Sequence, residues 1–83
     1  MPIAIYTSKQ LATTLRGRRK ALGLTQKDAA GLVGLLPKTV SALETNPDRC
    51  SVESLRTLLV ALKLDLTLTP KDESASAVRM AEW

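Results

Sequence analysis

Residues that cap and end helices divide positions 8–62 into four short segments, in which apolar residues recur at intervals of three and four. We expect Ser8 to cap the first helix and Gly23 to end it, while Thr25 caps the second helix and Gly34 ends that one. Helices this short are marginal on their own, so they must bury their apolar faces against one another. With 83 residues, the chain has room for one such helical domain.

The second half of the chain continues this pattern and then changes its period. Pro37 is expected to open a third helix and Ser51 to cap a fourth, with a turn at residues 46–48 between them. From Leu62 to Thr69 leucines alternate with polar residues, and this period of two predicts a strand with one apolar face. Residues 3–6 show a similar but shorter alternation.

The predicted fold is therefore mostly α, with four to five helices and a short C-terminal strand in one domain over residues 1–70. Residues 71–83 are rich in Ser, Ala and charge, as is typical of a flexible tail. The strand has an unpaired edge, which either residues 3–6 or a second copy of the strand would cover. We expect a homodimer in which the strands form an intersubunit sheet, with an apolar interface made of Leu64, Leu66 and Leu68.

Composition excludes most catalytic chemistry. The chain has no histidine and a single cysteine, Cys50, which rules out histidine-based catalysis, an intrachain disulfide and histidine or multi-cysteine metal sites. We therefore expect no enzymatic activity, no metal and no other cofactor. No apolar run approaches the ~20 residues of a membrane span, and residues 1–9 lack a signal-peptide pattern, so we expect no membrane partner and a cytoplasmic location.

Positive charge is concentrated in the predicted domain. Residues 1–70 carry 10 basic and 5 acidic side chains, a net charge of +5, whereas residues 71–83 carry 2 basic and 3 acidic ones. Such an excess favours a polyanionic partner such as DNA or RNA, although it also serves solubility alone.

Residues 25–44 are predicted to form two helices joined by a tight turn, which is the helix-turn-helix layout. Ala30 is small where the two helices cross, and Gly34 provides the positive φ of the turn. Val40 and Leu43 hold the second helix of the pair on the core, so that its N-terminal end is free to enter a major groove. An ordinary helical hairpin in a small bundle has the same spacing and remains the alternative.

The motifs Gly23-Leu24-Thr25-Gln26 and Val33-Gly34, followed by Val40-Ser41 and Glu44, resemble the Cro/C1-type helix-turn-helix repressors. Gln10-Leu11-Ala12, Asn46-Pro47-Asp48, the strand at 64–68 and the final Glu82-Trp83 are similar to the HipB-type antitoxins of HipBA toxin–antitoxin systems. This resemblance implies a bacterial, homodimeric protein that represses its own operon at an inverted-repeat operator, where it is nucleoid-associated. It also implies binding and neutralisation of a HipA-type Ser/Thr kinase. Ala29 and Leu36 depart from the usual Leu and Ser or Thr of the wider family.

The candidate DNA-binding residues lie in or beside the predicted helix-turn-helix. Lys38 can donate to guanine O6 and N7, although a phosphate contact suits it nearly as well, and Leu36 or Pro37 can touch a thymine methyl group. Thr39 and Ser41 can donate to a base or a phosphate, and Ser41 matches a base-contact position of the resembled antitoxins, while the others fit backbone contacts. The full candidate set is Gln26, Lys27, Leu36, Pro37, Lys38, Thr39, Ser41, Thr45 and Asn46.

Three further expectations concern residues outside that set. The resemblance assigns Arg19 and Glu44 to a structural ion pair, whereas Arg16, Arg18 and Lys20 suit either DNA or the helix dipole. The same resemblance favours docking of Trp83 into the kinase, over a chance residue at the chain end. A plain dimeric repressor without a kinase partner and a protein-interaction adaptor stay open as alternatives, the latter because of the apolar start of the third helix.

Overall fold

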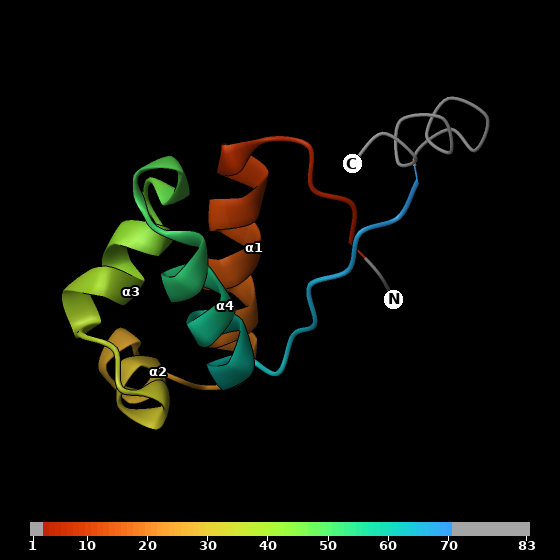
Figure 1. Cartoon of the computed structure of the whole chain (residues 1–83). Helices are drawn as coiled ribbons and strands as arrows, with labels where there is room; N and C mark the ends of the chain where they lie inside the picture. The colour runs from red at the N-terminus through yellow and green to blue at the C-terminus, as the bar shows by residue number, and fades with distance from the viewer. Residues whose placement is uncertain (1–2, 71–83) are drawn as a thin grey trace.

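The computed structural model describes residues 3–70, which form a bundle of short helices (Figure 1). The elements in chain order are α1 (Ser8–Ala21), α2 (Gln26–Val33), α3 (Pro37–Leu43), the 3-10 helix η1 (Pro47–Arg49) and α4 (Val52–Ala61). Helix α2 packs against both α3 and α4, η1 contacts both α1 and α3, and α2 and α3 project to one side of the molecule (Figure 1). The mostly helical fold predicted from the sequence is confirmed.

Each of three helices begins at a hydroxyl residue that caps it. Thr25 caps α2 and Ser51 caps α4, as predicted, whereas α1 is capped by Thr7 and not by Ser8. The Thr7 Oγ1 accepts from the Gln10 backbone N–H at 3.1 Å, while the Gln10 side chain accepts from the Thr7 N–H at 3.0 Å. This reciprocal capping box satisfies two helix-end donors at once, which Ser8 cannot do because the residue three positions later is Leu11.

Residues in the left-handed conformation follow α1, α2 and α4. Gly23 and Gly34 have φ of 74° and 75°, as expected for the turns after α1 and α2. After α4 the same role falls to Lys63, whose φ is 57°. The Leu64 N–H then donates to the Leu59 carbonyl at 3.0 Å, which closes the end of α4. Residues 62 and 63 therefore terminate a helix and do not begin a strand.

The core lies where α1, α2, α3 and α4 meet, and aliphatic side chains fill it. Alanines at the centre of α2 let this helix pack closely on α3 and α4, since they add no bulk at the contact. Val52 lies three residues before Leu55 and would share its face of α4, yet it is exposed at the first turn of that helix. The buried residues of the cluster are Leu15, Ala29, Ala30, Val40, Leu43, Leu58, Leu59, Ala61 and Leu62.

Within residues 3–70 neither predicted strand is formed. The segments 3–7 and 64–70 lack regular structure and lie on the same side of the molecule, away from α2 and α3 (Figure 1). Leu64 packs on the core of its own chain, whereas Leu66 and Leu68 are exposed. A single chain offers these leucines no strand partner, so the intersubunit sheet is not confirmed by the fold of one protomer.

Candidate nucleic-acid interface

Helices α2 and α3 form a helix-turn-helix unit with a short, well-anchored turn. The Thr25 hydroxyl accepts from the Asp28 N–H at 2.9 Å, and the Thr25 N–H donates to the Asp28 carboxylate at 3.0 Å. The bond that the Thr25 backbone N–H donates to the carboxylate is the largest cause that holds the pKa of Asp28 below its ordinary value. The charged carboxylate of this cap therefore stabilises the fold fully at pH values above the ordinary pKa of Asp. This stabilisation is lost as the pH falls through the lowered pKa of Asp28.

The turn fixes the start of α3. The Leu35 N–H donates to the Ala30 carbonyl at 2.9 Å, directly after the left-handed Gly34. Leu35 is half-buried against the core, and Val40 and Leu43 are fully buried. The opposite side of α3 is consequently presented to solvent.

The candidate DNA-binding residues lie at the start of α2, along α3 and directly after α3. Leu36, Pro37 and Lys38 are exposed at the start of α3, and Thr45 and Asn46 are exposed just after it. Lys27 is exposed, while Gln26, Thr39 and Ser41 are half-buried. The exposed residues of this set at the two ends of α3 and at the start of α2 are called the edge of α3 below.

Two candidate residues already have partners within the chain. The Gln26 Nε2 donates to the Glu44 Oε1 at 3.3 Å, so this amide is held against the ion pair described next. The Thr45 hydroxyl donates to the Ser41 carbonyl at 2.8 Å. A DNA phosphate would meet Gln26 in a fixed orientation, which favours a positioning contact over base reading.

Arg19 and Glu44 form a two-pronged ion pair beneath this surface. The Arg19 Nε lies 2.6 Å from the Glu44 Oε2, and the Arg19 Nη2 donates to the Glu44 Oε1 at 3.0 Å. The Arg19 Nη1 donates to the Leu24 carbonyl at 2.8 Å, so one guanidinium joins α1, the loop before α2 and the end of α3. The hydrogen bonds that Arg19 donates to the Glu44 carboxylate raise the pKa of Arg19 above its ordinary value.

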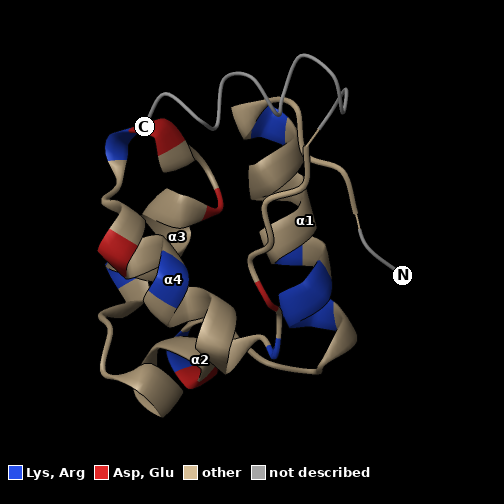
Figure 2. Ribbon diagram, turned by 45° about the vertical axis from the view of Figure 1, so that its right-hand side comes forward, with Lys and Arg blue, Asp and Glu red and all other residues tan. Residues whose placement is uncertain are grey.

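Arg16, Arg18 and Lys20 lie in the last two turns of α1, where basic residues gather, yet their environments differ (Figure 2). The Arg18 Nε donates to the Leu62 carbonyl at 2.9 Å and so ties the end of α1 to the end of α4. The sequence does not predict this contact of Arg18, because no local pattern shows which carbonyl a long side chain reaches. Arg16 is exposed and lines an open cleft of about 490 Å³ together with Lys9, Thr45 and Asn46.

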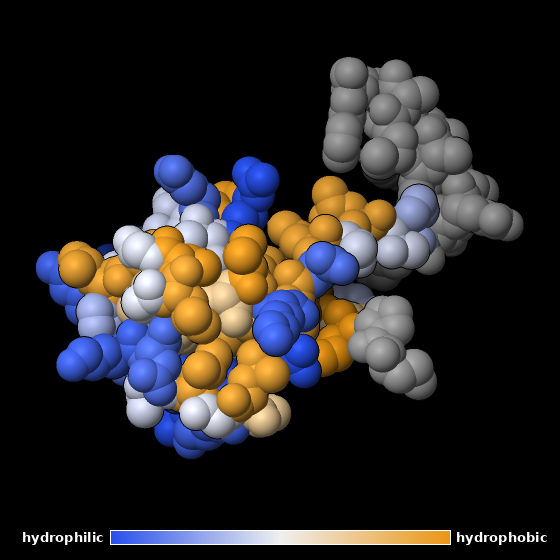
Figure 3. All heavy atoms as spheres, turned by 90° about the horizontal axis from the view of Figure 1, so that it is seen from below, coloured by the Kyte–Doolittle hydropathy of each residue, from blue (hydrophilic) through white to orange (hydrophobic). Residues whose placement is uncertain are grey.

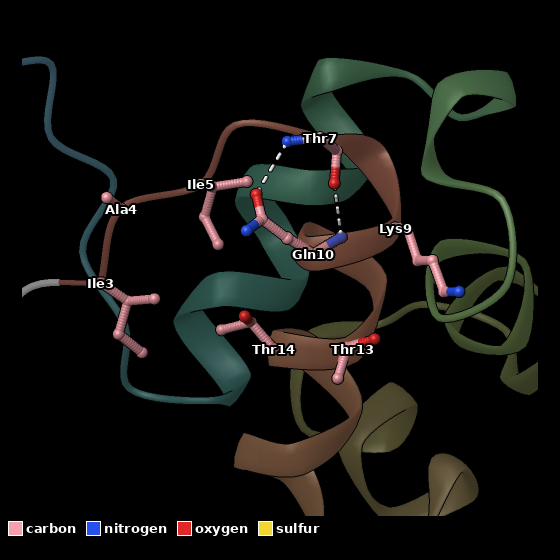
Figure 4. Close-up of a pocket in the computed structure, with 8 residues that line it drawn as sticks. All are labelled: Ile3, Ala4, Ile5, Thr7, Lys9, Gln10, Thr13 and Thr14. Atoms are coloured by element: carbon pink, nitrogen blue, oxygen red, sulfur yellow. Dashed lines mark hydrogen bonds between the residues drawn. The ribbon is translucent and has the colours of Figure 1, made fainter.

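Another open pocket lies between residues 3–7 and α1, and it has a volume of about 330 Å³ (Figure 4). Ile3 and Ile5 line it, while the Gln10 side chain accepts from the Tyr6 N–H at 2.7 Å and so holds the segment against α1. In the part of the chain that the structure describes, no three potential metal ligands lie together. No helix among residues 3–70 is long and apolar enough to cross a membrane.

Comparison with protein families identifies the class. A family model described as a helix-turn-helix domain matches residues 10–71, which include all four α-helices except the first two residues of α1. The geometry of α2, the turn and α3 thus belongs to a helix-turn-helix protein.

The relatives within this class are antitoxins. The HipB antitoxin of Escherichia coli O6:H1 strain CFT073 is 36% identical over 82 residues, covering 95% of this chain and 87% of that protein. The HipB antitoxin of Escherichia coli K12 is 34% identical over 64 residues, covering 77% and 73%. The chain therefore belongs to the HipB family of antitoxins, and the expectation that it is not an enzyme agrees with this family.

Solved structures give the same assignment. A HipB–O4 20mer complex superposes with a TM-score of 0.79 at 31% identity, covering 86% of this chain and 100% of the other. A HipA–HipB–O2–O3 complex superposes with a TM-score of 0.80, at the same identity and coverage.

Proposed function

We propose that this chain is a dimeric DNA-binding antitoxin that represses its own operon and neutralises a HipA-type Ser/Thr kinase. The observation that carries the proposal is the exposed edge of α3, held by the Arg19–Glu44 pair on a fold shared with HipB in complexes with operator sites and with HipA. A location in the cytoplasm, on the nucleoid when bound to an operator, follows from that role.

Helix α3 is the recognition helix of the proposed complex. Lys38 extends from its first turn, where an ammonium group can reach guanine O6 and N7 in the major groove. Thr39 and Ser41 provide hydroxyls further along it, and Lys27, Thr45 and Asn46 flank the groove at the backbone. The net charge of +5 over residues 1–70 supports phosphate contacts.

Dimerisation is proposed to use the segments 3–7 and 64–70. Leu66, Leu68, Ile3 and Tyr6 are exposed there, and hydrophobic atoms on this side continue those that cover much of the face seen in Figure 3. Pairing of two copies of residues 64–69 would turn these segments into an intersubunit sheet and cover the leucines. Residues 1–70 are thus proposed as the DNA-binding and dimerisation domain, with 71–83 as its tail. A dimer also reads two half-sites, which one such domain cannot do.

Replacing Lys38 with alanine tests the DNA-reading role directly. Specific binding is expected to weaken by roughly 1–3 kcal/mol, with relaxed discrimination at one base pair in each half-site. Competition assays with single base-pair variants of the preferred site measure this. Arg56→Ala, which removes an exposed cation from α4, should leave discrimination unchanged. If Lys38→Ala lowered the affinity equally for all DNA sequences, Lys38 would contact a phosphate and not a base.

Trp83 is proposed as a kinase contact, and it lies outside the described residues. Removal of Glu82-Trp83 is expected to weaken capture of a HipA-type kinase by about 2 kcal/mol or more, since a buried indole is a typical interface hot spot. Titration calorimetry with the kinase measures the loss, while DNA affinity and the Tm of the same sample should not change. Equal kinase affinity with and without Trp83 would contradict this role.

A further inference from the structure

Leu36 stands at a helix N-cap position, where a side chain usually accepts a hydrogen bond from the first turn of the helix. It is the N-cap residue of α3, yet its side chain makes no capping hydrogen bond. It is also 57% exposed, so it gains little from burial. A Ser, Thr, Asp or Asn would stabilise the helix start more than leucine does. The stability of the single chain therefore does not explain why a leucine stands at this position.

The neighbours of Leu36 fix where it lies. Leu35 is half-buried against the core, and the Val40 N–H donates to the Leu36 carbonyl at 3.2 Å. Pro37 restricts the backbone at the first position of α3. Leu36 is thus held in place at the tip of α3, next to the exposed Lys38, on the edge that the proposed function gives to the major groove.

The chemistry of the side chain defines what it can recognise there. Leucine has no donor or acceptor, so it cannot distinguish bases by hydrogen bonds. Among the four natural bases, only thymine presents a methyl group in the major groove, and apolar contact with that methyl is a known means of direct readout. A phosphate or a guanine edge at this position would instead be desolvated against leucine without compensation.

We propose that Leu36 reads the 5-methyl group of a thymine in each half-site of the operator. This inference rests on the proposed function and adds the identity of one base to it. The preferred site then contains a thymine in each half whose methyl group, and not merely its hydrogen-bonding pattern, contributes to affinity.

Replacement of thymine by deoxyuridine tests the inference, because it removes only the methyl group and keeps base pairing. The preferred site is first selected from random duplexes with the full-length protein, and each thymine is then replaced symmetrically in both half-sites. One symmetric replacement is expected to lower affinity about 15-fold, from about fourfold for each buried methyl group. With Leu36→Ala, the same replacement should change affinity less than twofold.

Leu32→Ala is the matched control, since Leu32 on α2 is 64% exposed and lies outside the proposed edge. It should retain the full sensitivity to deoxyuridine, and thermal unfolding should show that both variants fold. Equal affinity of the protein for the thymine and deoxyuridine forms of the selected site would overturn this inference alone. So would an effect of deoxyuridine on affinity that is as large in Leu36→Ala as in the parent. Selection that returns no preferred sequence overturns the DNA-reading function together with the inference.

Discussion

The Arg19→Ala variant is expected to lose about 3–5 kcal/mol of the free energy of unfolding, which is a large part of the stability of a domain this small. The side chains of Arg19 and Glu44 are only 10% and 3% exposed, so the substitution leaves a carboxylate buried without its cation. It also removes the donor at the Leu24 carbonyl, which anchors the loop before α2. Urea denaturation followed by circular dichroism measures the loss.

Arg16→Ala is the control for this experiment, because Arg16 is an exposed arginine on the same helix. Its effect should stay within about 0.5 kcal/mol, as for most surface substitutions. Replacing both members of the pair by apolar residues, Arg19→Met with Glu44→Leu, should recover part of the loss since no charge is then left unpaired. An Arg19→Ala protein as stable as the parent would refute a structural role of the pair.

Leu66→Lys is expected to convert the dimer to monomer. Leu66 is 57% exposed in the single chain, so lysine is tolerated there by the protomer but would be buried without a partner in the proposed interface. Sedimentation equilibrium should show a mass near 9.0 kDa for the variant and twice that for the parent. Circular dichroism should show that the helices remain.

Val60→Lys provides the comparison, since Val60 is 71% exposed on α4 and lies outside segments 3–7 and 64–70. This variant should remain dimeric. If Leu66→Lys is also a stable dimer, the two protomers meet elsewhere on the molecule.

Features that depend on nearby residues were predictable from the sequence. Thr25 with Asp28 sets the start of α2, and Gly34 ends it, because capping and left-handed turns are decided within three or four residues. The motif from Thr25 to Glu44 was therefore enough to indicate the helix-turn-helix. The cap of α1 also depends only on nearby residues, Thr7 and Gln10. The prediction of Ser8 as this cap is wrong by one position.

Features that depend on distant residues were not predictable in this way. The bond from Arg18 to the Leu62 carbonyl spans 44 positions, and nothing near Arg18 specifies it. The bond from the Gln26 amide to Glu44 spans 18 positions, and it forms because the end of α3 lies beside the start of α2. The alternation at 62–69 begins the predicted strand two residues too early, because Leu62 and Lys63 end α4.

The most direct test of a dimeric antitoxin that reads DNA through α3 is quantitative footprinting of the parent protein on its selected site at several salt concentrations. The predicted result is two protected half-sites whose centres lie about one helical turn, or a multiple of it, apart, with affinity that falls steeply as salt rises. Protection that is uniform along the duplex and independent of sequence would contradict the central claim.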